Sequence, residues 1–204
     1  MPTPSVTPSS RMSGAQRREQ LLDVTKAIAV DRGFYAVSIE AVAREAGITR
    51  PVVYGHFQDL NGLLEALVER EAARALQQLT TILPDAPPPG DRRELLLAAL
   101  EAYLRAAQAD PGTWRLVLMP PQGAPALLRE HIARGRDAMV AQLAEAVRPG
   151  LVPGREPPDP ELTARMLSTI ADEGVRLLLT DPARYPAERL LALARWLLDG
   201  LGRS

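Results

Sequence analysis

Apolar residues recur at steps of three and four along most of the chain, and nowhere do apolar and polar residues alternate as in a half-buried strand. Clusters of proline and glycine interrupt this pattern, which is typical of helices joined by turns. The pattern therefore predicts an all-α protein of about nine helices. The expected ranges are 16–31, 39–46, 50–56, 59–83, 91–109, 113–119, 125–147, 160–180 and 187–200.

The second and third expected helices are joined by a turn of the helix-turn-helix type. Ser38 is placed to cap the first of them, because its hydroxyl can accept a backbone N–H that lacks a partner in the first turn. Gly47 follows that helix and can adopt the left-handed conformation that ends it without steric strain. Thr49 is a second N-cap, and Pro51 falls in the first turn of the next helix, where its missing N–H is harmless. This order of residues predicts a DNA-binding corner.

The third expected helix is too short to form a core, and its side chains suit a DNA surface. Arg50 can donate two hydrogen bonds to a guanine edge, whereas Tyr54 and His56 can donate to phosphate oxygens and fix the register. Val53 and Phe57 are expected on the buried side. The alternative is an ordinary helical corner with polar surface residues. The predicted DNA-binding residues are Ser38, Thr49, Arg50, Pro51, Val52, Tyr54 and His56.

From about residue 18 to residue 67 the chain resembles the DNA-binding domain of the TetR (tetracycline-repressor) family of bacterial regulators. The resemblance rests on RREQLLDVTKAIAVDRGF, on Ser38, on IEAVAREAGIT and on the run YGHF at residues 54–57. The family implies a three-helix head, a fourth connecting helix, an all-α ligand-binding body and a homodimer. One position departs from the family, which usually has a lysine near a phosphate where this chain has Leu60. That contact is not carried over.

The sequence divides into three expected parts. Residues 1–13 are rich in proline, serine and threonine and are expected to be disordered, residues 14–60 to form the helix-turn-helix domain, and residues 61–204 an all-helical domain for ligand binding and dimerisation. Residues 1–60 hold seven basic and six acidic side chains. The net charge of this region therefore does not support DNA binding. Binding must depend on specific contacts of individual side chains and on dimerisation.

Composition excludes several other classes. There is no cysteine, and no apolar run approaches the length of a membrane span. The N-terminus lacks the apolar core of a signal peptide. We therefore expect a cytoplasmic protein that binds double-stranded DNA and no membrane.

The last two expected helices are apolar on nearly all sides, which indicates burial on several faces. In a chain of 204 residues a second copy would supply part of that burial. The alternative is a terminal helical hairpin buried within a monomer. The predicted dimer interface consists of Leu167, Ile170, Gly174, Leu178, Leu190, Leu193 and Leu197.

Motifs for catalysis are lacking. The chain has two histidines, no nucleophile elbow and no phosphate-binding or dinucleotide-binding loop, so we expect no enzyme, no metal site and no cofactor. The sequence favours a ligand-responsive transcriptional repressor that a small apolar effector releases from a palindromic operator. The alternatives are an α-helical enzyme with an accessory helix-turn-helix and a ligand-independent DNA-binding protein. The residues predicted to bind the effector are Tyr103, Trp114, Met119, Met166 and Arg176.

Overall fold

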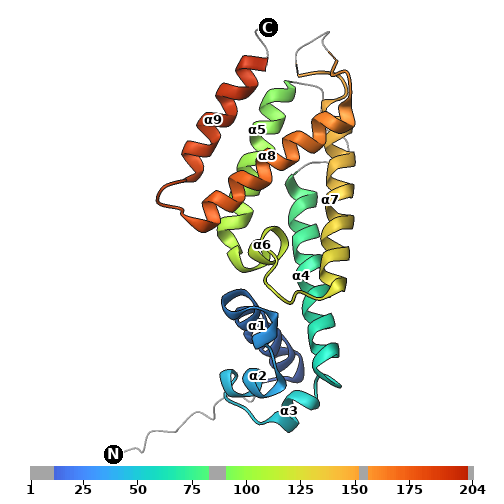
Figure 1. The fold of residues 1–204 in the computed structure, drawn as a ribbon, viewed down its shortest axis with the longest axis vertical. Coiled ribbons are helices and arrows are strands. Elements are labelled where there is room, and N and C mark those ends of the chain that lie inside the picture. The colour runs from blue at the N-terminus through green and yellow to red at the C-terminus, as the bar shows by residue number, and fades with distance from the viewer. Residues whose placement is uncertain (1–11, 83–90, 152–155, 202–204) are drawn as a thin grey trace, which may run out of the picture. The chain divides into compact units, whose positions relative to one another are not determined.

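The computed structural model describes residues 12–82, 91–151 and 156–201, and all regular structure within these ranges is helical (Figure 1). The all-α class expected from the apolar spacing is confirmed. The described residues form nine α-helices and one short 3-10 helix, η1. They are α1 (Gly14–Arg32), η1 (Phe34–Ala36), α2 (Ile39–Glu45), α3 (Arg50–Tyr54), α4 (Leu60–Ile82), α5 (Arg92–Ala109), α6 (Pro111–Leu118), α7 (Ala126–Val147), α8 (Pro160–Thr180) and α9 (Ala187–Leu201).

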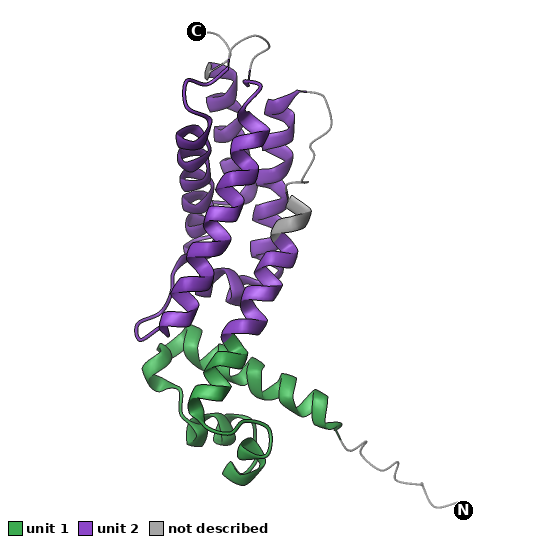
Figure 2. Ribbon diagram, turned by 90° about the vertical axis from the view of Figure 1, so that its right-hand side faces the viewer, with its two compact units in different colours: residues 1–67 green, residues 68–204 purple. Residues whose placement is uncertain are grey.

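The chain divides into two compact units, Met1–Leu67 and Val68–Ser204, here called unit 1 and unit 2 (Figure 2). The division falls within α4, because the first two turns of this helix belong to unit 1 and carry the fully buried Leu63 and Leu67. The sequence places the boundary earlier, at residue 60. Residues 1–11 of the predicted disordered tail lie outside the described residues.

Unit 1 is built on α1, whose start is fixed by a capping box. The Ser13 hydroxyl accepts from the Gln16 backbone N–H at 3.2 Å, and the Gln16 side chain accepts from the Ser13 N–H at 2.8 Å. The helix ends at Gly33, whose φ of 83° favours glycine. The buried apolar residues of unit 1 come from every element: Leu21, Leu22, Ile28, Ala29, Phe34, Val37, Ile39, Ala41, Val42, Ala43, Val53, Phe57, Leu63 and Leu67.

Unit 2 is a helical bundle in which α8 packs against α5, α6 and α7, and α5 packs against α9 (Figure 1). Three aspartates start its helices, because the carboxylates of Asp91, Asp110 and Asp159 accept backbone N–H groups in the first turns of α5, α6 and α8. One hydrophobic cluster fills the bundle. Its largest members are Tyr103, Leu104, Trp114, Leu118, Val140, Leu143, Val147, Val175, Leu178 and Leu179.

One local prediction needs correction, and one short element was not predicted. The sequence treats Asp110, Pro111 and Gly112 as a break, whereas α6 begins at Pro111 because Asp110 caps it and proline fits the first turn. The short helix η1 was not expected from the apolar spacing. No helix among the described residues is both long and apolar enough to cross a membrane.

Candidate nucleic-acid interface and apolar cavity

The turn between α2 and α3 has the geometry that its sequence predicts. The Ser38 hydroxyl accepts the Ala41 N–H at 3.1 Å, which satisfies a donor at the start of α2. Gly47 has a φ of 67°, and the next residue, Ile48, donates its N–H to the Ala43 carbonyl at 3.0 Å. Thr49 lies at the N-cap position of α3, but its side chain accepts no capping hydrogen bond. The Thr49 hydroxyl therefore has no capping role in α3.

The short helix α3 presents one edge to solvent and buries the other. Val53 is fully buried and Phe57 is 4% exposed, as the sequence predicts. Tyr54 is 53% exposed, and Arg50 is exposed at the first turn. Of the predicted DNA-binding residues, Ser38, Thr49, Arg50, Pro51, Val52 and Tyr54 are exposed and His56 is half-buried. All seven belong to unit 1.

Arg18 of α1 contacts the segment that follows α3, a role that sequence reasoning missed. Its Nη1 donates to the His56 carbonyl at 3.1 Å, and its guanidinium lies 4.4 Å from the centroid of the Phe57 ring. Arg18 and His56 are 38 positions apart in the sequence, so no local pattern would reveal this contact.

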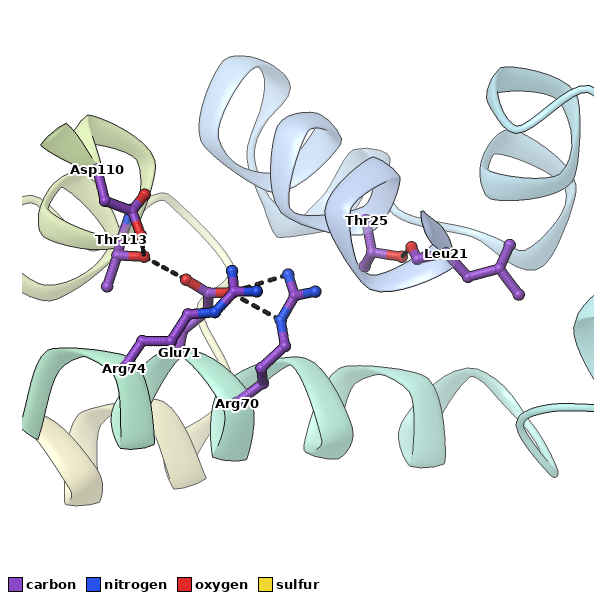
Figure 3. Close-up of polar contacts among 7 residues, drawn as sticks. All are labelled: Leu21, Thr25, Arg70, Glu71, Arg74, Asp110 and Thr113. Carbon is purple, nitrogen blue, oxygen red and sulfur yellow. Dashed lines mark hydrogen bonds and ion pairs between the residues drawn. The ribbon is translucent and has the colours of Figure 1, made fainter. Parts of the chain in front are cut away.

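In unit 2, a buried carboxylate ties α4 to α6. Glu71 is 1% exposed and forms ion pairs with Arg70 at 2.9 Å and with Arg74 at 3.3 Å. The Thr113 hydroxyl of α6 makes a short hydrogen bond to Glu71 and lies 2.7 Å from an oxygen of Asp110. Figure 3 shows the Thr113 hydroxyl between the carboxylates of Glu71 and Asp110. The same figure shows the buried Thr25 of unit 1, whose hydroxyl donates to the Leu21 carbonyl. Burial of this kind requires that the charge be paired.

Unit 2 contains an apolar cavity of about 1150 Å³. Its wall includes Trp114, 1% exposed, and Tyr103, 9% exposed, whose rings meet edge to face with centroids 4.8 Å apart. Trp114 Nε1 donates to Gln78 Oε1 of α4 at 2.7 Å. The lining also reaches the exposed Ile170, Leu193 and Trp196, so the cavity opens toward solvent along α8 and α9.

One polar cluster interrupts the apolar wall. The Tyr103 hydroxyl donates to Asp172 Oδ1 at 2.9 Å, and Arg136 Nη2 lies 3.3 Å from Asp172 Oδ2. Burial and the neighbouring Asp172 charge raise the pKa of Tyr103 above its ordinary range, so its hydroxyl remains a donor. Burial also raises the pKa of Asp172, against the opposing effects of the Tyr103 hydrogen bond and the Arg136 charge.

The cavity brings together only part of the predicted effector set. Tyr103 and Trp114 line it, whereas Met119, Met166 and Arg176 do not. Met166 is 58% exposed on α8, and Arg176 instead donates to the Leu118 carbonyl at 3.2 Å and pairs with Glu173. Helical spacing alone could not distinguish these faces. The polar lining residues Arg136 and Asp172 were not predicted as effector contacts.

The predicted dimer residues also differ in their surroundings. Ile170, Leu193 and Leu197 are 56%, 54% and 37% exposed, as an interface requires in the absence of its partner. Leu178 is instead 3% exposed within the hydrophobic cluster of unit 2. Leu167, Gly174 and Leu190 are half-buried. The exposed apolar surface of α8 and α9, here called the α8/α9 face, consists of Leu162, Met166, Ile170, Leu193, Trp196 and Leu197.

The described residues contain no group of three or more histidine, aspartate or glutamate side chains that could hold a metal ion. Besides the Tyr103–Asp172–Arg136 cluster, the polar residues of the cavity lining are Glu69, Glu71, His131, Arg134, Ser168 and Glu173. These groups can bind and orient a molecule through hydrogen bonds and charge.

Comparison with known proteins agrees with this geometry. Residues 21–67, which carry α2 and α3, match the family described as bacterial regulatory proteins of the tetR family. The HTH-type transcriptional activator FasR of Mycolicibacterium smegmatis is 31% identical over 108 residues, which cover 53% of this chain and 48% of FasR. The matched region thus spans about half the length of that relative.

Solved structures share the fold over nearly the whole chain. A TetR-like transcriptional regulator from Rhodococcus sp. RHA1 has a TM-score of 0.72 at 25% identity, over 93% of this chain and 100% of that one. The transcriptional regulator FadR from Bacillus subtilis, solved in complex with stearoyl-CoA, has a TM-score of 0.63 at 17% identity, over 91% and 97% of the two chains. This chain belongs to the TetR family of bacterial transcriptional regulators.

Proposed function

We propose that this protein is a ligand-responsive repressor that binds a palindromic operator as a homodimer in the bacterial cytoplasm. The observation that carries the proposal is the exposed edge of α3, where Arg50 and Tyr54 face solvent while Val53 and Phe57 anchor the helix. Arg50 would read a guanine, and Tyr54 and His56 would contact phosphates. Because residues 1–60 have a near-neutral net charge, these specific side-chain contacts would be the main source of affinity for DNA.

The α8/α9 face supports the homodimer. Six large apolar side chains are exposed there, and water contact with such a patch is unfavourable in an isolated chain. A palindromic site requires two recognition helices about 34–36 Å apart, which a two-fold dimer provides. Pairing of the α8/α9 faces would also cover the opening of the cavity along α8 and α9.

The cavity supports a small, largely apolar effector. Its volume of about 1150 Å³ slightly exceeds the usual range for ligand pockets, about 300–1,000 Å³, and its lining is mostly aliphatic and aromatic. The B. subtilis FadR structure shows that this fold can hold a long apolar chain with a polar head, as stearoyl-CoA. In this chain the predicted contacts Tyr103 and Trp114 are joined by the unpredicted Asp172 and Arg136.

The helix α4 provides a route from the cavity to DNA. It carries Glu71 and Gln78, two turns apart, and both are held by α6 through Thr113 and Trp114. The same helix begins in unit 1, at Leu60. An effector that displaces α6 would change how α4 is held and shift the population toward a state with lower operator affinity.

Selection of bound duplexes from a random library by the full-length protein tests the proposal. We expect a palindrome with half-sites about one helical turn apart. Equal affinity for the selected and scrambled duplexes at physiological salt would contradict a sequence-specific regulator. Footprinting on the selected duplex then shows whether both half-sites are occupied.

A further inference from the structure

Tyr103, Arg136 and Asp172 come from three different helices, α5, α7 and α8, and meet at the wall of the cavity. Asp172 is 8% exposed and lies between the Tyr103 hydroxyl at 2.9 Å and the Arg136 guanidinium at 3.3 Å. The side chain of Arg136 is 41% exposed, so the pair lies at the boundary between the interior and the open part of the cavity.

Such a pair discriminates against a charged ligand of either sign. A cation that approaches Asp172 also approaches Arg136, and an anion that approaches Arg136 meets Asp172, so attraction and repulsion largely cancel. The ligand charge would still lose its hydration in a mostly apolar cavity. An uncharged polar group avoids this penalty. Further N–H groups of Arg136 and the Tyr103 oxygen can serve a carbonyl or hydroxyl group on the ligand.

The other charged residues of the cavity lining do not favour a charged ligand of either sign. Glu69 is exposed at the rim of the cavity, where water screens its charge. The remaining charged residues each have an opposite charge nearby. These pairs are Glu71 with Arg70 and Arg74, Glu173 with Arg176, and Arg134 with Glu130.

We infer that the effector is an uncharged, mainly apolar molecule with a hydroxyl or carbonyl group, which the Tyr103–Asp172–Arg136 cluster recognises. The inference rests on the effector cavity of the proposed function and adds the chemical class of the ligand. It assigns Asp172 and Arg136 as the pair that determines which head-group charge is accepted.

Three probes with the same apolar chain and different head groups test this: octanol, octanoate and octylammonium. Calorimetric titration of the full-length wild-type protein at neutral pH measures each affinity. We expect octanol to bind about tenfold or more tightly than either ion, because only octanol enters without an unpaired charge. Thermal unfolding of every variant, without ligand, checks that it is folded.

Two substitutions should change the preferred charge in opposite directions. Asp172→Asn leaves Arg136 without its carboxylate, so octanoate should gain about tenfold relative to octanol. Arg136→Gln leaves Asp172 without its cation, so octylammonium should gain by about the same factor. Arg136 is partly exposed, so Arg136→Gln should fold. This variant therefore still tests the inference if Asp172→Asn does not fold.

Matched controls remove the same charges elsewhere on the lining. Arg134→Gln and Glu173→Gln alter side chains that are 64% and 57% exposed, and the order of the three probes should stay that of the wild type. Tyr103→Phe keeps the charge pair but removes a hydroxyl. It should weaken octanol binding without favouring either ion.

The outcomes separate this inference from the proposed function. Tightest binding of octanoate or octylammonium to the wild type would overturn an uncharged effector but retain an effector cavity. An unchanged order of the probes in both Asp172→Asn and Arg136→Gln would also overturn it. If no octyl probe binds, the effector cavity itself is refuted, whereas selection of DNA duplexes tests operator binding independently.

Discussion

Trp114 and Gln78 are joined across the cavity wall: the indole Nε1 of α6 donates to the amide oxygen of α4 at 2.7 Å. The Trp114 ring itself lines the cavity. The ring that lines the cavity therefore belongs to the same side chain that donates to α4, the helix that begins in unit 1. The neighbouring Thr113 makes the second hydrogen bond from α6 to α4, at Glu71.

We expect Gln78→Met to weaken communication between effector and operator while DNA affinity without effector is retained. The substitution keeps the length of the side chain but removes the acceptor for the Trp114 N–H. Coupling free energies in such systems are about 1–3 kcal/mol, and loss of one linking contact should reduce the coupling by about 0.5–2 kcal/mol. Operator affinity measured with and without a saturating cavity ligand gives the coupling. Gln77→Met, at the exposed neighbouring position, serves as control. Equal coupling in the wild type, Gln78→Met and Gln77→Met would show that the Trp114–Gln78 contact does not carry the coupling.

Replacement of Thr113 by valine should lower the free energy of unfolding by about 1–3 kcal/mol, because Glu71 would lose a donor within a buried site. Valine has nearly the shape of threonine, so packing changes little. Urea unfolding measures the effect. Thr169→Val is the matched control, since its exposed hydroxyl donates to the Arg165 carbonyl of its own helix and the change should stay within about 0.5 kcal/mol. A similar effect of both substitutions would show that the Glu71 contact adds no stability.

Arg50→Ala should weaken binding to the selected operator by about 1–3 kcal/mol and relax the preference at one position of each half-site. Tyr54→Phe should instead weaken binding to all duplexes alike and leave the salt dependence unchanged, because its uncharged hydroxyl would contact phosphate without releasing a counterion. Titrations on selected and scrambled duplexes distinguish the two roles. Arg105→Ala, an exposed arginine of unit 2 paired with Glu101, controls for loss of a positive charge. Equal losses on both duplexes for Arg50→Ala would refute a base contact.

The parts of this structure that depend on neighbouring residues could be predicted from the sequence. The Ser38 cap, the positive φ of Gly47 and the buried side of α3 each follow from residue types within a few positions. The Tyr103–Asp172 hydrogen bond joins residues 69 positions apart, and no local pattern reveals it. The position of Met166 could not be predicted from the sequence either. Its helical spacing indicates an apolar face, but spacing cannot distinguish a face toward a cavity from one toward solvent or a second copy.

Leu193→Glu should convert the proposed dimer to monomers, because it places a charge within the α8/α9 face, where a partner would bury it. Leu193 is 54% exposed in the single chain, so the fold of the monomer should tolerate glutamate. Light scattering at micromolar concentration measures the molecular mass. Arg195→Glu introduces a glutamate at an exposed position on the side of α9 away from Leu193, and this variant should remain dimeric. A wild-type protein that is monomeric under these conditions would refute the α8/α9 dimer.

The raised pKa of Asp172 predicts how its contribution to stability changes with pH. The ordinary pKa of an aspartate is 3.8, and burial raises the pKa of Asp172 above this value in the folded protein. As the pH falls toward 3.8, the folded state therefore takes up a proton before the unfolded state does, and the unfavourable burial of the charge is relieved. The free energy of unfolding of the wild type, relative to that of Asp172→Asn, should accordingly increase as the pH is lowered. Urea unfolding of both proteins at several pH values measures this difference, and Asp199→Asn, at an exposed carboxylate, gives the background for loss of one negative charge. A difference that decreases toward low pH would mean that Tyr103 and Arg136 stabilise the charged form by more than burial destabilises it.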